Sequence, residues 1–369
     1  MMGGASNLVF NRCEICAECG APRSERLERK AFLPGIFGVI VSICLVIVTA
    51  LGFIPIISPV LESRAYAAEP LRESEDAMTG ELTGYTYTLP VSENSPLNRF
   101  FQLQAEVWNR ENSTSLKLEP VPGRGGSLAL TRARNAPRDG SALFAVAYPD
   151  FFLQDMIRKP YYRPDDIQCM IIYARSPMVL WVRDDGEFPD LYAFLDHVRD
   201  LQDPYMVAGD GSFTSYHLAS LRFDRVSGSK SLYMPQLEEA EGIKAVIGKK
   251  ALAWWGHPYS RDLVPGLKPL AVSGRSRVES LPNVPTFSEF GLDFVEETFF
   301  GLGVPAGSEP FEVDYIYEQF RYMLGMPDFK QLSLEMGFLP FETAPDDVAP
   351  FLDAQKLRSE QLKADYSWF

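Results

Sequence analysis

The sequence predicts an α/β protein of two lobes that face one ligand cleft. Apolar segments with the length of strands alternate with amphipathic helical segments from Tyr85 to the C-terminus, and this alternation favours layered, mainly parallel α/β structure. Two glycine-rich turns, PGRGGS at 122–127 and GDGSFTS at 209–215, lie in separate α/β sections. Ligands of such sheets bind at the carboxyl ends of the strands, so both turns are expected at the cleft. The length of 369 residues allows two domains.

The first 67 residues differ from the rest of the chain. A basic stretch ending at Lys30 precedes an uncharged apolar run at 31–61, and Ala65-Tyr66-Ala67 matches a signal-peptidase site. The run is longer than an ordinary signal core and could span a bilayer. A cleaved export signal, with the mature chain starting at Ala68, and an uncleaved inner-membrane anchor therefore both remain open. Either one places the body in the periplasm, after a cytoplasmic leader at 1–30, a signal or anchor at 31–67 and a flexible tether at 68–84.

Composition excludes several classes of function. The net charge of −14 argues against nucleic acid as a partner. Cys13, Cys16 and Cys19 have the spacing of metal ligands, but a closed zinc site needs four, so we interpret them as incidental and expect no metal and no cofactor. Cys169 alone remains in the exported part, so no disulfide forms within it. GDGSFTS is not a hydrolase elbow, and three histidines support no catalytic triad, so we expect no enzyme.

Lobe one is expected at 85–177 and 299–369. Apolar segments predict strands at 85–89, 116–121, 142–147, 169–173 and 299–304. Helical spacing predicts helices at 97–108, 128–134, 151–157, 311–324, 329–336 and 346–364. Ser95 followed by Pro96 is typical of a helix start, with a capping serine and a proline at the first position.

Lobe two is expected at 178–298, with strands at 178–182, 205–207, 251–255 and 267–272 and helices at 188–200, 216–223 and 237–247. The turn at 209–215 leads into the second of these helices, which Ser212, Thr214 or Ser215 could cap. Glycines let backbone N–H groups turn outward, and a helix start adds partial positive charge, so the turn suits a carboxylate or phosphate. It could equally be an ordinary strand-to-helix connection.

Several motifs in order resemble one family. LPNVPTFSEFG at 281–291, LAVSGRSR before it and FGLGVPAGSEP after it are similar to motifs of the extracytoplasmic solute receptors of tripartite tricarboxylate transporters, the Bug family. The resemblance implies a two-lobed periplasmic-binding-protein fold of type II-like design. It also implies a monomer without catalytic activity, which closes over a small organic carboxylate and delivers it to membrane permease subunits. In the family, backbone N–H groups and hydroxyls hold the carboxylate.

The resemblance and the two turns together predict the ligand-binding residues. They are Ser92, Asn94, Ser95, Asn98, Gly123, Arg124, Gly125, Gly126, Ser127, Tyr148, Gly209, Gly211, Ser212, Thr214, Ser215 and Trp254. Arg124 is either a counter-charge for the ligand or a solvated loop residue. Trp254 is either a core residue or a contact for an apolar part of the ligand.

The first loop departs from the family pattern, because Asn94, Ser95, Asn98 and Gln102 replace its glycines and both of its charges. Two interpretations follow: a transport receptor with an unusual ligand, or a membrane-tethered sensory or scaffold protein whose ligand site is altered or lost. In the first case the lobes are expected to close by hinge motion at 176–179 and 298–301.

Overall fold

The computed structural model describes residues 84–159 and 161–366, all within one compact unit, Met78–Phe369. The expected leader, signal or anchor, nearly all of the tether, and the three closely spaced cysteines lie outside the described residues. In the part of the chain that is described, no helix has the length and apolarity needed to cross a membrane.

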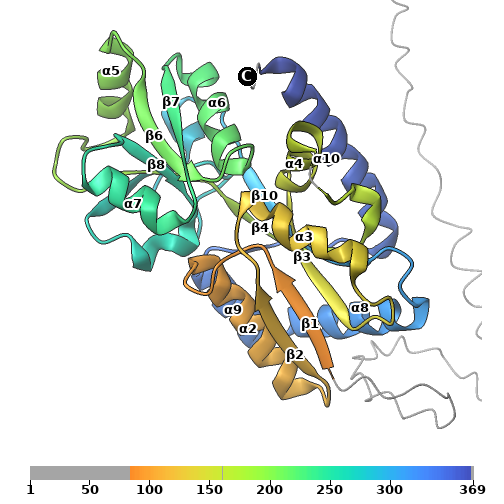
Figure 1. The fold of residues 1–369 in the computed structure, drawn as a ribbon. Coiled ribbons are helices and arrows are strands. Elements are labelled where there is room, and N and C mark those ends of the chain that lie inside the picture. The colour runs from red at the N-terminus through yellow and green to blue at the C-terminus, as the bar shows by residue number, and fades with distance from the viewer. Residues whose placement is uncertain (1–83, 160, 367–369) are drawn as a thin grey trace, which may run out of the picture. The chain divides into compact units, whose positions relative to one another are not determined.

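The first lobe is built on a six-stranded sheet of order β11-β4-β10-β3-β1-β2 (Figure 1). Its strands are β1 (Gly84–Leu89), β2 (Ser115–Pro120), β3 (Ala142–Tyr148), β4 (Ile167–Pro177), β10 (Glu297–Pro305) and β11 (Leu339–Pro340). Its helices are α2 (Pro96–Glu111), α3 (Ser127–Thr131), α4 (Asp150–Arg158), α8 (Pro310–Gly325), α9 (Pro327–Glu335) and α10 (Pro345–Asp365), with short 3₁₀ turns η1 (Arg124–Gly126), η2 (Arg132–Asn135) and η3 (Pro164–Asp166).

The second lobe is built on a five-stranded sheet of order β7-β6-β8-β5-β9. Its strands are β5 (Val179–Arg183), β6 (Tyr205–Asp210), β7 (Ser231–Gln236), β8 (Ala253–Gly256) and β9 (Leu267–Val272). Its helices are α5 (Leu191–Asp200), α6 (Ser215–Ser227) and α7 (Glu239–Ile247), with 3₁₀ turns η4 (Pro258–Leu263) and η5 (Phe287–Phe290).

The expectation of parallel layers is wrong for part of each sheet. Strands β2, β1 and β3 are parallel, but β10 is antiparallel to both of its neighbours, β3 and β4. In the second sheet β5 is antiparallel to β8 and β9. The reason is the path of the chain, which leaves the first sheet along β4 and returns along β10 in the opposite direction. The edge strand β7 was also missed, because Pro235 and its half-exposed side chains give no apolar run.

Each lobe has an aromatic core. In the first lobe Phe100 of α2 stacks on Phe338 with ring centroids 3.8 Å apart; in the second lobe Phe223 and Trp255 pack in the core beside Phe294.

Helix α2 begins as predicted. The hydroxyl of Ser95 accepts a hydrogen bond from the N–H of Leu97, 3.3 Å away, with proline at the first helical position. This start anchors the loop at 90–95, which lies at the cleft.

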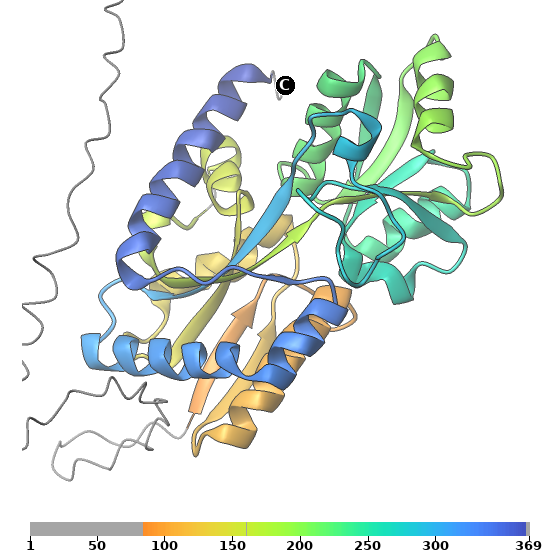
Figure 2. The same ribbon diagram turned by 180° about the vertical axis from the view of Figure 1, so that it is seen from behind.

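Two adjacent segments connect the sheets, as Figure 2 shows for β4 and β10. The N–H of Met178 donates to the carbonyl of Glu296 at 3.1 Å where they pass. The Glu296 carboxylate is only 2% exposed. It pairs with Arg222 of α6 and Arg358 of α10, so this ion group joins a helix of each lobe at the crossing. The lobe boundaries and the hinge positions stay predictions.

Candidate functional site

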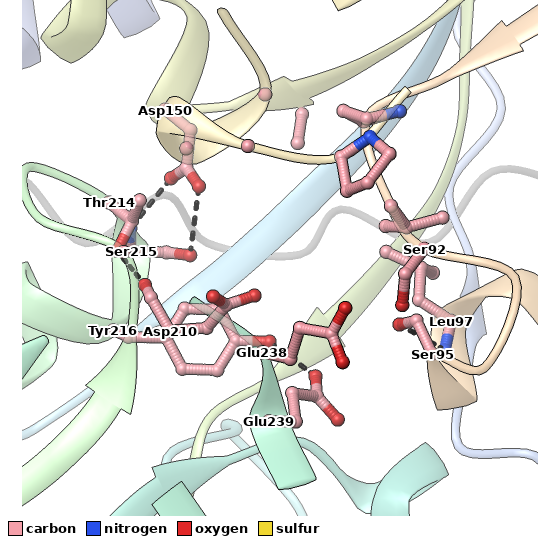
Figure 3. A pocket seen from close by; sticks show the side chains of 18 of the residues that line it. Ser92, Ser95, Leu97, Asp150, Asp210, Thr214, Ser215, Tyr216, Glu238 and Glu239 are labelled. Carbon is pink, nitrogen blue, oxygen red and sulfur yellow. Dashed lines mark hydrogen bonds between the residues drawn. The ribbon is translucent and has the colours of Figure 1, made fainter. Parts of the chain in front are cut away.

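A cavity of about 400 Å³ lies between the two sheets, lined by residues of both. Its wall consists of four main segments, at 90–97, 122–126, 210–216 and 235–240. Figure 3 shows the hydroxyls of Ser92 and Ser95 on one side of the space and the carboxylates of Asp150 and Asp210 on the other, with the carboxylate of Glu238 drawn between Asp210 and the serines. The two glycine turns predicted from the sequence therefore meet at one site.

The first turn brings its backbone close to the other lobe. All residues from Gly123 to Gly126 have positive φ angles, between 54° and 118°. A Cβ atom on Gly125 would collide with Nε2 of Gln154 and lie 3.0 Å from Cγ2 of Thr214. Glycine at this position thus permits both the left-handed conformation and the close approach.

The second turn touches the first. Gly211 has φ of +66°, and a Cβ atom there would lie 2.9 Å from Cγ2 of Thr214 and 3.5 Å from Cα of Gly125. Thr214 directs its hydroxyl to the carbonyl of Asp210 at 2.7 Å instead of capping α6. The turn is therefore held rigidly, with its glycine against the opposite lobe.

A carboxylate of the protein itself lies at the start of α6. The N–H of Ser215 donates to Oδ1 of Asp150 at 2.6 Å, and the Ser215 hydroxyl lies 3.5 Å from Oδ2. Asp150 is the first residue of α4, in the other lobe. The N-terminus of α6, which the sequence suggested for a ligand anion, thus already contacts an internal one.

Two further residues of α4 hold the same turn. Nε2 of Gln154 donates to the carbonyls of Ser212 and Phe213, each at 2.9 Å. The guanidinium of Arg158 lies 5.2 Å from the centre of the Phe213 ring. We call Asp150, Gln154 and Arg158 the α4 latch, because together they join one lobe to the turn of the other.

The described cavity lining is rich in carboxylates: it includes Asp150, Asp210, Glu238 and Glu239 but only two guanidiniums, those of Arg124 and Arg158. Glu239 is 5% exposed and accepts hydrogen bonds from Tyr216 at 2.7 Å and Ser260 at 2.8 Å. Burial raises the pKa of Asp150 to about 7 despite its bond from Ser215. Burial, and then the neighbouring Glu239 and Asp150, raise the pKa of Asp210 well above its usual value. The cavity thus disfavours additional negative charge at this end.

The imidazole of His257 and the ring of Tyr259 also line the cavity, together with these carboxylates. His257 places Nδ1 2.9 Å from the carbonyl of Pro177, which assigns the proton to Nδ1, and burial lowers its pKa to about 3. Its ring stacks on Tyr259 at 4.8 Å. His257 is therefore a neutral wall residue. Among the described residues no cluster of His, Cys, Asp and Glu could hold a metal ion.

The expected site residues divide into two groups. Those that line the cavity are Ser92, Asn94, Ser95, Gly123, Arg124, Gly125, Gly126, Gly211, Ser212, Thr214 and Ser215. Asn98, Ser127, Tyr148, Gly209 and Trp254 are not part of the lining.

Each residue of the second group has a structural role instead. Asn98 donates to the carbonyl of Glu93 at 2.9 Å and so holds the first loop. Ser127 donates to the carbonyl of Arg124 at 3.0 Å. Tyr148 is buried in an apolar cluster of the first lobe, and Gly209 lies beneath the ring of Tyr233. Trp254 is fully buried beside Trp181, which corrects its assignment to the cleft.

Sequence reasoning missed the acidic side of the cavity. Asp210 lies inside the motif GDGSFTS but was passed over for the glycines and hydroxyls. Asp150 lies two residues after the end of β3, near the carboxyl end of a strand where site residues of α/β sheets occur, so its position was a usable signal. Glu238 and Glu239 have no such signal, because they start α7 and resemble the usual acidic first turn of a helix.

Solved structures share the fold. The periplasmic binding protein BugD superposes with a TM-score of 0.70 at 19% identity, covering 76% of this chain and 97% of that one. MatC from Rhodopseudomonas palustris with bound malate gives 0.67 at 22% identity, covering 76% and 98%. An R. palustris protein with adipate gives 0.70 at 20% identity, covering 76% and 95%. These matches confirm the two-lobed periplasmic-binding-protein fold.

Sequence comparison gives the family. The UPF0065 protein in gbd 5'region of Cupriavidus necator is 23% identical over 258 residues, covering 68% of this chain and 79% of that protein. The model of the tripartite tricarboxylate transporter family receptor matches residues 102–366, which confirms the resemblance seen in the motifs. This is a family of transporter binding proteins, not of enzymes. The chain belongs to the TctC family of tripartite tricarboxylate transporter receptors, the Bug-like periplasmic binding proteins.

Proposed function

We propose that this protein is a periplasmic receptor that captures a small organic carboxylate and delivers it to the permease subunits of a tripartite tricarboxylate-type transporter. The observation that carries the proposal is the cavity of about 400 Å³ between the two glycine turns. This volume is in the range of small-molecule sites, about 300–1,000 Å³. The relatives with malate and adipate support a small organic acid as the ligand.

We expect the carboxylate of the ligand to bind at the lobe-one side of the cavity. Ser92 and Ser95 offer hydroxyls there, and the backbone of the first turn lies beside them. The opposite side is less suitable, because the N–H of Ser215 already donates to Asp150. About three hydrogen bonds to a charged group, at 1.5–3 kcal/mol each, support micromolar affinity, roughly −8 kcal/mol, after the costs of association.

A thermal-shift screen followed by titration calorimetry tests the proposal. The panel contains mono-, di- and tricarboxylates, their amino-substituted analogues and aromatic acids, and at least one of them is expected to bind at micromolar concentration. Ser92→Ala should weaken that binding about tenfold, because one hydroxyl donor to a charged group is lost. Ser276→Ala, an exposed serine outside the lining, is the matched control. Failure of the whole panel to bind would contradict the proposal and favour a sensory or scaffold role.

A further inference from the structure

We propose that Asp210 makes the cavity selective for solutes that carry a cationic nitrogen in addition to their carboxylate. The inference rests on the proposed function, because it concerns the ligand of the same cavity. It is carried by three observations: where the negative charges lie, what already contacts the start of α6, and what the Asp210 carboxylate lacks.

The two sides of the cavity differ in charge. Ser92, Ser95 and the first turn supply neutral hydrogen-bonding groups and one guanidinium, that of Arg124. Asp210 lies across the space from the two serines, and the carboxylate of Glu238 is drawn between them (Figure 3). A dicarboxylate that binds its first group at the serines would bring its second group toward these acids. A second carboxylate there further disfavours the ionised form of these acids, whereas an ammonium group in the same place is attracted to the ionised acid.

The start of α6 does not favour a second carboxylate either. A helix N-terminus is the common place for a ligand anion, but here Asp150 accepts from the N–H of Ser215 at 2.6 Å. Gln154 and Arg158 fix α4 against the same turn. A second ligand carboxylate would have to displace Asp150 from its donor, so the lobe-two side is left with acceptors.

Asp210 is an acceptor without a donor. Across residues 84–159 and 161–366 no hydrogen bond or ion pair reaches its carboxylate, although its carbonyl accepts from the hydroxyls of Thr214 and Tyr233. By contrast, Tyr216 and Ser260 satisfy Glu239. The side chain of Asp210 is only partly exposed, and the close-up places its carboxylate at the cavity, so no donor among the described residues offsets its loss of hydration. A ligand nitrogen is the missing donor, and the anchored backbone holds the acceptor ready for it.

The surroundings of Asp210 also determine whether the protein releases or takes up protons when a ligand binds. The groups that act on it or line the cavity with it are Asp150, Glu238, Glu239, Glu241, Tyr216, Tyr233, Tyr259, His257, Arg124 and Arg158. Burial and the acids hold the pKa of Asp210 well above its usual value, so the empty site favours the protonated acid more than water does. A cationic group favours the ionised acid and releases protons, whereas a second carboxylate takes protons up.

The test uses pairs of acids that differ in one terminal group. Succinate is paired with 3-aminopropionate, glutarate with 4-aminobutyrate and adipate with 5-aminopentanoate, and each is titrated into the full chain purified from the envelope in mild detergent. In at least one pair the amino acid should bind about 10–100-fold more tightly, as expected for a hydrogen-bonded charge pair. Asp210→Asn should abolish this preference, and Asp196→Asn, which removes an exposed charge of the same lobe, should keep it.

Titration of the unmodified protein in phosphate and in Tris at pH 7 gives a second readout that needs no variant. Binding of the amino acid should release protons; proton uptake or no exchange overturns the inference. Equal or tighter binding of the diacids also overturns it and leaves the proposed function standing. Binding of neither class in the panel refutes the proposed function, and this inference with it.

Discussion

The α4 latch makes a sharp prediction about the ligand-free protein. Gln154→Ala removes two hydrogen bonds from Nε2 to the carbonyls of Ser212 and Phe213, both 2.9 Å long. These bonds join α4 of one lobe to the turn of the other, so their loss affects lobe closure more than the core of either lobe. At about 1 kcal/mol each they contribute roughly 2 kcal/mol, which is a shift of about 30-fold in the equilibrium between closed and open forms.

Small-angle scattering without ligand measures this shift directly. The Gln154→Ala protein should have a larger radius of gyration than the unmodified one, because water can satisfy the freed carbonyls once the lobes separate. Gln355→Ala is the matched control: this glutamine is also buried, lies in α10 and has an Oε1 without a hydrogen-bond partner. An unchanged radius for Gln154→Ala, or an equal increase for Gln355→Ala, would refute the role of the latch.

Four further predictions concern binding, pH and processing. Gly211→Val should weaken ligand binding at least tenfold, and more than Arg124→Ala does, because its Cβ would press on Thr214 at a φ of +66°; calorimetry showing the reverse order would indicate a side-chain clamp. The free energy of unfolding should fall by about 2 kcal/mol between pH 5 and 7 and level off above pH 7, because the pKa of Asp150 is raised to about 7 and the folded state therefore binds more protons than the unfolded state in that window; a rise between pH 5 and 7 would contradict this. N-terminal sequencing of the mature protein should begin at Ala68, and an intact N-terminus in the membrane would indicate an anchor. Saturating ligand should compact the protein in scattering, and unchanged dimensions at full occupancy would exclude hinge closure.

Local sequence signals predicted most of the elements. The alternation of apolar and amphipathic segments located nearly every strand and helix, since each signal lies within one element. Ser95 with Pro96 marked the start of α2, and the glycines of the two turns marked the cleft. The antiparallel placement of β10 had no local signal, because strand direction depends on how the chain returns from the second lobe.

The character of the cavity could not be obtained in this way. Asp150 and Ser215 are separated by 65 residues, and no spacing rule connects a carboxylate on α4 with the start of α6. Trp254 and Trp255 are neighbours on β8, and their side chains point to opposite faces of the sheet, where they pack in two different apolar clusters. The sequence alone does not give the register of β8, so it does not show which of the two faces each side chain occupies. Which hydroxyls and acids share one cavity follows only from the packing of the two lobes.

Amide hydrogen exchange with the tightest-binding acid of the screen tests the central claim most directly. If that acid binds between the two glycine turns, protection should increase in peptides covering 92–98, 122–127 and 209–216, with little change in α5, none of whose residues lines the cavity. The same peptides should lose this protection when the ligand is removed by dialysis. Saturating ligand that leaves all three segments unchanged, or that protects a different surface, would contradict the assignment of the cavity as the binding site.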